Sequence, residues 1–211
     1  MENVTADGTA HRANEEGTSG TSPVPTGRHD PEGRRRQIVL AAAELIPEVG
    51  LAKLTHRLVA QRAGVSLGAT TRYFASLDEL RSEALRVMAE LLEADLATTR
   101  ATLEAEGCTP QSLTKDLMEF LHDRELVRIS VELISAANAD PTLRPLANIW
   151  TEGLVELLSP VVGPIVARGA SLVMDGAAVH ASINDEPLDG RLVERIFGAL
   201  LKGGDPASSP E

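Results

Sequence analysis

The stretch that decides the fold is residues 55–74, THRLVAQRAGVSLGATTRYF. It predicts two short helices joined by a tight turn at Ala63-Gly64-Val65. Thr55 and Ser66 are suitable N-caps for the two helices, and Gly64 gives the turn the backbone freedom to reverse the chain. The second helix carries mostly small side chains, so it can lie close to a nucleic-acid groove.

Composition indicates an all-α protein. Hydrophobic residues make up 43% of the 211 residues but aromatics only 2%, so the core must consist of Leu, Val, Ile and Ala. This mixture favours helices packed on helices, and the alternation typical of strands is scarce. The single cysteine, Cys108, excludes an intrachain disulfide framework. We see no signal peptide or long apolar run, so we expect a soluble, cytoplasmic protein.

Charge is distributed unevenly along the chain. The net charge of −11 argues against nucleic acid as a partner. However, residues 28–76 hold eight basic and four acidic side chains, whereas residues 91–211 hold nine basic and nineteen acidic ones. One end of the protein can therefore approach phosphate while the other end is repelled by it.

Apolar periodicity, caps and Pro or Gly breaks predict about nine helices. We place them at residues 33–49, 55–63, 66–74, 77–105, 110–122, 124–139, 142–160, 164–183 and 188–203. Pro47 is expected to kink or end the first helix, with Gly50 as its terminator. The expected organisation is a disordered tail (1–32), a helix-turn-helix domain (33–76), a second helical domain (77–204) and a C-terminal tail (205–211).

Small and polar side chains at the start of the second helix suit entry into the major groove. These candidate groove residues are Ser66, Gly68, Ala69, Thr70 and Thr71. Around them, Thr55, Arg57, Arg72 and Tyr73 are placed to hold phosphates, although Tyr73 is alternatively a core residue with its hydroxyl at the surface. The run Arg34-Arg35-Arg36 is either a basic arm on DNA phosphates or a solvated helix start. Arg62 is interpreted as a solvated side chain.

The first helix, the AGVS turn, the RYF helix end and the following S-x-D-E-L together resemble the N-terminal domain of the TetR family of bacterial regulators, over about residues 34–85. The resemblance implies a homodimeric repressor with a small-molecule pocket in its later helices. It implies that Thr55 and Tyr73 contact phosphate, that residues 66–72, Leu67 included, form the recognition helix, and that Phe74 is a core aromatic. The chain departs from the family at Thr71, where an aromatic is frequent, and at Leu77, where a lysine is frequent.

Several residues are candidates for a ligand cavity: Met88, Leu91, Met118, Leu121, His122 and Trp150. Tryptophan offers a stacking face with one polar donor, but plain core packing is the alternative for Trp150 and for the Met and Leu positions. No two histidines share i, i+4 spacing, so we expect no metal site. We find no phosphate loop or nucleophile elbow, and expect neither an enzyme nor a cofactor.

These patterns predict a homodimer that pairs through residues 164–183 and 188–203 and places two recognition helices on a double-stranded DNA operator. A small-molecule effector would shift the dimer away from the spacing that fits the operator, through the long fourth helix. The alternative is a helical small-molecule-binding or protein-interaction module without operator binding, which Leu77 and the net negative charge motivate.

Overall fold

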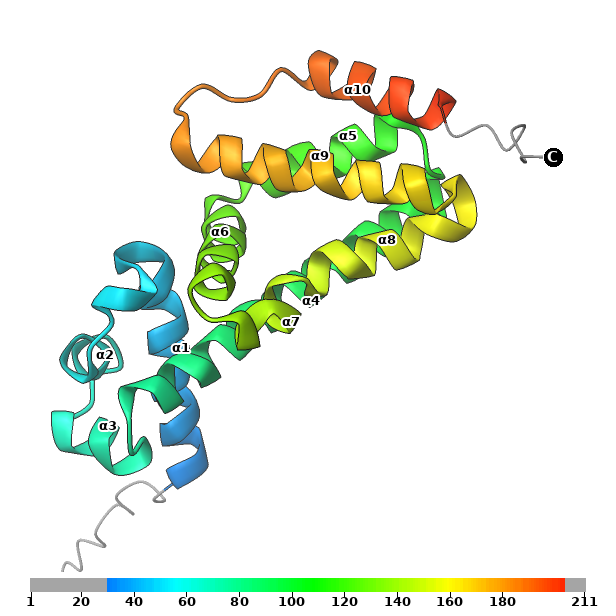
Figure 1. The fold of residues 1–211 in the computed structure, drawn as a ribbon. Helices are drawn as coiled ribbons and strands as arrows, with labels where there is room; N and C mark the ends of the chain where they lie inside the picture. The colour runs from blue at the N-terminus through cyan, green and yellow to red at the C-terminus, as the bar shows by residue number, and fades with distance from the viewer. Residues whose placement is uncertain (1–29, 204–211) are drawn as a thin grey trace, which may run out of the picture. The chain divides into compact units, whose positions relative to one another are not determined.

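The computed structural model describes residues 30–203, and all of the regular secondary structure in that part of the chain is helical (Figure 1). The all-α prediction is therefore confirmed. The elements, in chain order, are α1 (Pro31–Val49), η1 (Leu51–Lys53), α2 (His56–Arg62), α3 (Leu67–Tyr73), α4 (Leu77–Glu106), α5 (Pro110–His122), α6 (Arg124–Ala139), η2 (Pro141–Leu143), α7 (Arg144–Ala147), α8 (Ile149–Val162), α9 (Pro164–Ile183) and α10 (Gly190–Lys202). The tail expected at 1–32 lies outside the described residues as far as residue 29, and α1 already begins at Pro31. The tail expected at 205–211 lies wholly outside them.

Local capping defines the helix-turn-helix. The hydroxyl of Thr55 accepts a hydrogen bond from the Leu58 amide, and the Ser66 hydroxyl accepts one from the Ala69 amide, each at 3.2 Å. Between the two helices Gly64 has φ +63°, a conformation that glycine adopts without a Cβ penalty. The turn between α2 and α3 therefore forms where the sequence places it.

Proline does not end α1. Pro47 lies inside the helix, which continues to Val49. Gly50 then leaves the helix with φ +84°, while its amide still donates to the Ile46 carbonyl at 2.8 Å. The terminator is thus the glycine, as expected.

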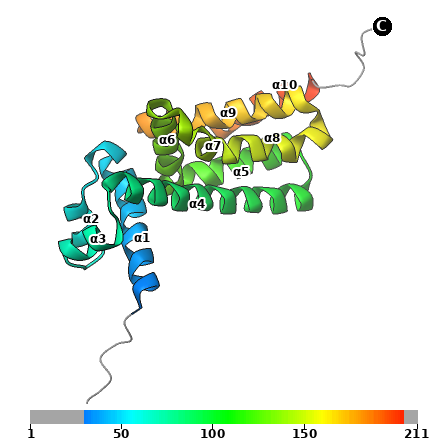
Figure 2. The same ribbon diagram turned by 60° about the horizontal axis from the view of Figure 1, so that its bottom comes forward.

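The long helix α4 runs from the helix-turn-helix into the second group of helices, where α5, α6, α7 and α8 pack against it (Figures 1 and 2). In that group α8 packs along α9, and α5 packs along α10. The buried apolar side chains form one continuous cluster that includes Ile38 and Phe74 at one end and Leu154 and Phe197 at the other. No helix among residues 30–203 is long and apolar enough to cross a membrane.

The single helix expected at 142–160 is wrong. This segment is divided into η2, α7 and α8. Pro141 and Pro145 have no amide hydrogen, and Asp140 accepts from the Thr142 amide at 2.9 Å, so the short elements η2 and α7 form in place of one continuous helix. The helix end expected at residue 160 is also wrong, because α8 continues through Pro160 to Val162, and Gly163 with φ +82° follows it.

Candidate nucleic-acid interface and ligand cavities

The outward face of α3 carries mostly small side chains and is exposed to solvent. Ser66, Gly68 and Thr71 are exposed, and Leu67 keeps 49% of its surface. Ala69 is half-buried, and Tyr73 packs half-buried against the apolar core. A helix with this surface can approach a base edge closely, since no long side chain stands between its backbone and the groove.

Thr70 does not share that face. Its side chain is fully buried and its hydroxyl donates to the Leu67 carbonyl at 2.8 Å. Thr70 and the buried Phe74 are four residues apart, which puts both on the same side of a helix. That spacing is visible in the sequence, and it predicts the burial of Thr70 better than the size and polarity of threonine do.

Three arginines, one each on α1, α2 and α3, have free guanidinium groups. Arg36, Arg57 and Arg72 are exposed, and within the described part of the chain none of them makes a hydrogen bond or ion pair. Arg34 is also exposed and donates to Gln37, at 3.3 Å. Such groups are available to phosphate oxygens, which take about half or more of the hydrogen bonds in a typical protein–DNA complex.

Arg35, in contrast, is engaged inside the protein. Its guanidinium lies 4.8 Å from the centroid of the Phe74 ring and pairs with Glu83 at 3.4 Å and Glu79 at 3.9 Å. The side chain thus joins α1 to the first turns of α4. The run Arg34-Arg35-Arg36 is neither a uniform basic arm nor a purely solvated helix start.

Arg62 is also paired rather than solvated. It donates to Glu48 at 2.5 Å and to Glu44 at 3.5 Å, which ties α2 to α1. The hydrogen bond from Arg62 lowers the pKa of the Glu48 carboxyl. Both groups are at the surface, so this pair contributes little to stability.

At the start of α4, Leu77 is half-buried and packs against the core. The Ser76 hydroxyl accepts from the Glu79 amide at 3.1 Å, and Glu79 accepts from the Ala75 amide at 3.0 Å. The start of α4 therefore presents no cationic side chain at position 77. The Glu79 carboxylate is already bound to the Ala75 amide.

The six candidate ligand residues do not gather in one place. Met88 is fully buried in the core and Leu91 is 43% exposed on α4. Met118, Leu121 and His122 line one pocket, whereas Trp150 lines another. Sequence spacing along each helix could not separate these positions, because the division depends on which neighbouring helices cover them.

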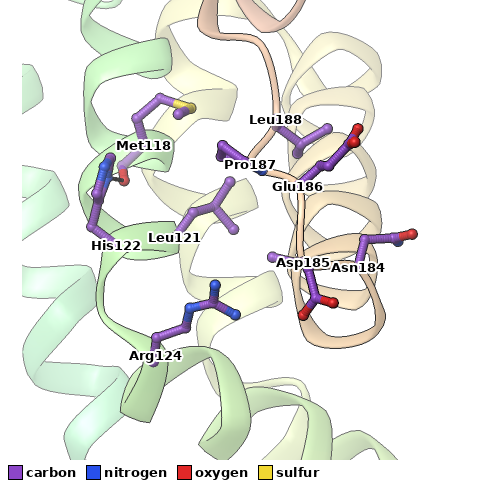
Figure 3. Close-up of a pocket in the computed structure, with 10 residues that line it drawn as sticks. Met118, Leu121, His122, Arg124, Asn184, Asp185, Glu186, Pro187 and Leu188 are labelled. Carbon is purple, nitrogen blue, oxygen red and sulfur yellow. Dashed lines mark hydrogen bonds between the residues drawn. The ribbon is translucent and has the colours of Figure 1, made fainter.

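The first pocket, which we call the α5–α9 pocket, has a volume of about 140 Å³ and lies between the end of α5 and the segment that follows α9 (Figure 3). His122 Nδ1 bonds to the Met118 carbonyl. Arg124 and Asp185 border the same space, so the pocket presents charges of both signs (Figure 3). Its lining is completed by Leu121, Ala181, Asn184, Glu186, Pro187 and Leu188.

The second pocket, which we call the Trp150 cavity, has a volume of about 30 Å³. It is lined by Leu92, Phe120, Ser130, Ile134, Ala147, Trp150, Thr151, Met174, Asp175 and Ala178. The rings of Trp150 and Phe120 stack with centroids 6.0 Å apart and an interplanar angle of 29°. The indole Nε1 donates to Oδ2 of Asp95 at 2.9 Å.

Two carboxylates of this region were missed in the sequence. Burial raises the pKa of Asp95 and that of Asp175, and within residues 30–203 the hydrogen-bond donor to Asp175 is the Thr151 hydroxyl, at 3.3 Å. Asp175 is the only acidic residue of the apolar helix α9. An isolated carboxylate on an apolar helix could have been recognised in the sequence as a buried acidic group. Asp95 lies on the strongly charged helix α4, where nothing in the sequence distinguishes it from the other acidic residues.

Comparison with known proteins agrees with this architecture. Residues 38–84 match the family model described as "Bacterial regulatory proteins, tetR family". The HTH-type transcriptional regulator BetI of Vibrio vulnificus is 24% identical over 183 residues, which are 82% of this chain and 92% of that protein. BetI of Burkholderia mallei is 28% identical over 170 residues, which are 75% and 86% of the two chains.

Solved structures are similar over nearly their full length. A TetR-family member from Streptomyces coelicolor A3 is 36% identical with a TM-score of 0.69, and covers 79% of this chain and 97% of its own. The multidrug binding protein EbrR complexed with ethidium is 38% identical with a TM-score of 0.68, and covers 82% and 99%. EbrR was also solved with proflavin, at 36% identity and a TM-score of 0.66, covering 79% and 99%. The chain belongs to the TetR family and is a non-enzymatic, DNA-binding transcriptional regulator.

Proposed function

We propose that this regulator is a ligand-responsive repressor that binds a pseudopalindromic operator as a homodimer. The observation that carries the proposal is the open outer face of α3 beside the unpaired guanidinium groups of Arg57 and Arg72. A face of this kind provides both a surface for base edges and side chains that fix its register on phosphates.

The roles that we propose follow the exposure of each side chain. Ser66, Leu67, Gly68, Ala69 and Thr71 face the bases, while Thr55, Arg57, Arg72 and Tyr73 hold phosphates together with Arg34 and Arg36. Thr70 and Arg35 support this surface from inside, because one is buried and the other is held by Phe74 and α4. The DNA-binding domain is residues 33–76 and the ligand-binding and dimerisation domain is residues 77–204.

The proposed homodimer pairs through α9 and α10. Ile165, Leu172 and Val179 recur every seven residues along α9, keep 86%, 63% and 42% of their surface and share one face. Leu192 and Ile196 continue the exposed apolar surface on α10. An apolar face of this extent on two adjacent helices supports pairing with a second copy of the chain, which presents the same face.

The proposed effector is a small molecule in the ligand-binding domain. EbrR, which is similar over most of this chain, was solved with ethidium and with proflavin. We place the effector in the Trp150 cavity, because Trp150 contacts α4 through Asp95 and α4 reaches the DNA-binding domain. Binding there would shift the population of dimers away from the spacing that fits the operator.

The test is the selection of bound duplexes from a random DNA library with the full-length chain. We expect an inverted repeat whose half-sites are centred roughly 34–36 Å apart, or a multiple of that distance. Arg72→Ala should bind the selected duplex more weakly, while Arg100→Ala, which removes an exposed arginine from the second half of α4, should bind it unchanged. Recovery of a single half-site would contradict the homodimer on DNA. Recovery of no preferred duplex would favour a ligand-binding module without operator binding.

A further inference from the structure

We infer that Arg81 is a positioning residue for DNA binding. From α4 it holds the segment that leads into α2, and so fixes where Thr55 and Arg57 meet the DNA phosphates. The inference rests on the proposed function for the phosphate contacts of these two residues. The role of Arg81 itself follows from its own hydrogen bonds and burial.

The guanidinium of Arg81 is engaged inside the protein. Its Nη2 donates to the carbonyl oxygens of Ala52, at 3.3 Å, and Leu54, at 3.4 Å. Its Nη1 pairs with Asp78 at 3.0 Å, one turn earlier on α4. Within residues 30–203 no backbone amide donates to either carbonyl. Arg81 therefore satisfies two backbone acceptors that η1 leaves open, and it joins α4 to this segment.

The segment held by Arg81 leads directly into the start of α2. Thr55 follows Leu54 in the chain, is exposed and caps α2, and Arg57 lies exposed in the first turn of that helix. Leu54 is only 1% exposed, so apolar packing also keeps the segment against the core. Apolar packing is not directional, whereas hydrogen bonds to two carbonyls are. The orientation of the segment therefore depends on Arg81.

The two ends of α2 are held by different helices. At its C-terminal end, Gln37 of α1 donates to the Ala63 carbonyl at 2.8 Å. At its start, the side-chain hydrogen bonds that reach residues 51–57 from another helix within residues 30–203 come from Arg81. The helix has seven residues and is thus roughly 10 Å long. Without Arg81, α2 can turn about its C-terminal end, which displaces Thr55 and Arg57 the most.

Direct contact between Arg81 and a phosphate is the competing explanation. Arg81 lies four residues after Leu77, on the same side of α4, so it is a cation close to the place where the family frequently has a lysine. However, its side chain keeps only 25% of its surface, and its Nε is buried without a hydrogen-bond partner in the described part of the chain. The remaining nitrogens hold Asp78 and the two carbonyls. This geometry favours positioning over direct contact.

The experiment is a pair of double-mutant cycles on the full-length chain, with the labelled duplex recovered from the random library as the probe. Arg81→Met keeps the length of the side chain and removes its donors. It is combined with Arg57→Ala on α2 in one cycle and with Arg36→Ala on α1 in the other. Both of these arginines are exposed and unpaired within residues 30–203.

We expect Arg81→Met to weaken duplex binding. Combined with Arg57→Ala, the loss should fall short of the product of the two single losses by about threefold or more, because a misplaced Arg57 has already lost its contact. Combined with Arg36→Ala, the two losses should multiply to within about twofold. Arg86→Met is the matched control, since it removes another ion-paired arginine of α4, and should leave affinity unchanged.

Arg81→Lys keeps the charge, but one ammonium group does not reproduce the fork of a guanidinium. We expect it to show the same coupling to Arg57→Ala with a smaller loss of affinity. It replaces Arg81→Met in both cycles if the methionine variant has an altered thermal unfolding curve.

Two outcomes would overturn the inference. One is unchanged affinity in Arg81→Met with an unaltered unfolding curve. The other is full affinity in Arg81→Lys together with losses that multiply between Arg81→Met and Arg57→Ala, which would make Arg81 an independent phosphate contact. The single variants separate this inference from the proposed function. If Arg57→Ala alone has no effect, the phosphate role of Arg57 is wrong and the inference is overturned with it. If Arg57→Ala weakens binding and Arg81→Met does not, only the inference is overturned.

Discussion

The indole Nε1 of Trp150 donates a 2.9 Å hydrogen bond to Oδ2 of Asp95, and this bond joins α8 to the middle of α4. The same helix α4 contacts α1 near its other end, where Glu79 and Glu83 hold Arg35. One continuous helix therefore touches both the Trp150 cavity and the DNA-binding helices. A ligand that displaced the indole would therefore act on the helix that also holds α1 through Arg35.

Substitution of Asp95 tests this connection. Asp95→Leu removes the acceptor of the indole N–H, while Asp95→Asn keeps an acceptor oxygen. Since allosteric coupling between sites typically corresponds to about a 5- to 150-fold change in affinity, we expect Asp95→Leu to reduce the effect of ethidium on operator affinity by about fivefold or more. Asp95→Asn should retain most of the effect. Anisotropy titrations of labelled operator with and without ethidium provide the measurement, and equal behaviour of both variants would argue against the connection.

Arg72→Ala tests the phosphate contacts on DNA. Each lost contact lowers the slope of log affinity against log salt by about one, and a homodimer carries two copies of the residue, so we expect the slope to fall by about two. Operator titrations at several salt concentrations give the slope. Arg100→Ala is the charge-matched control. A uniform loss of affinity with an unchanged slope would show that Arg72 acts on the fold rather than on phosphate.

The neighbouring threonines of α3 should separate stability from recognition. Thr70→Ala removes a fully buried side chain and its hydrogen bond to the Leu67 carbonyl, so we expect a loss of about 1–2 kcal/mol in the free energy of unfolding. Thr71→Ala, at an exposed position, should leave stability within about 0.5 kcal/mol and change operator affinity instead. Urea denaturation and operator titration of both variants distinguish these roles, and the reverse assignment would refute the orientation of α3 described above.

Leu172→Glu tests the proposed pairing of α9 with a second copy. The leucine is 63% exposed in the single chain, so glutamate is tolerated there, but in a dimer it would bury a carboxylate in the apolar face. We expect dimerisation to weaken by about a hundredfold or more, as followed by sedimentation velocity. Leu91→Glu makes the same change at an exposed leucine on α4 and should leave the assembly unaltered. If Leu172→Glu dimerises like the unaltered chain, the dimer interface does not include this face of α9.

Asp116 gives the protein a specific dependence on pH. Burial raises the pKa of its carboxyl from 3.8 to about 6, although the Thr99 hydroxyl donates to it at 3.1 Å. The Asp116 carboxyl therefore binds its proton more tightly in the folded chain than in the unfolded chain. The free energy of unfolding consequently falls as the pH rises from about 4 to about 6. Asparagine at this position cannot ionise. The free energy of unfolding of Asp116→Asn should therefore exceed that of the unaltered chain by roughly 2 kcal/mol at neutral pH and equal it below about pH 4.

The control for that prediction is Asp140→Asn. The pKa of Asp140 is lowered, first by the Thr142 amide and then by the Thr142 hydroxyl, so its ionised form is the favoured one in the folded chain. Its substitution should bring no gain at neutral pH. Urea denaturation across the acidic range measures both variants, and a gain in both would point to relief of general negative charge instead of the burial of Asp116.

The helix-turn-helix could be predicted from the sequence because its caps and turn depend on neighbouring residues. The tertiary contacts could not be predicted, because they join residues far apart in the chain. The caps at Thr55 and Ser66 each act within three residues, so the residue types alone indicate them. The bond between Asp95 and Trp150 spans 55 positions. Arg35 and Glu83 lie 48 apart. No periodicity encodes which of three adjacent arginines meets a distant carboxylate, or that Trp150 and Met118 fall in different pockets.

The small volume of the Trp150 cavity sets a threshold for any response. At about 30 Å³ it is far below the roughly 300–1,000 Å³ of sites that hold drug-sized molecules, so a drug-sized ligand would bind only molecules whose helices have moved apart. If about one molecule in a hundred is open, the measured affinity is about a hundredfold weaker than the intrinsic one. If the effector binds there as proposed, its concentration has to rise well above the intrinsic dissociation constant before it occupies the cavity.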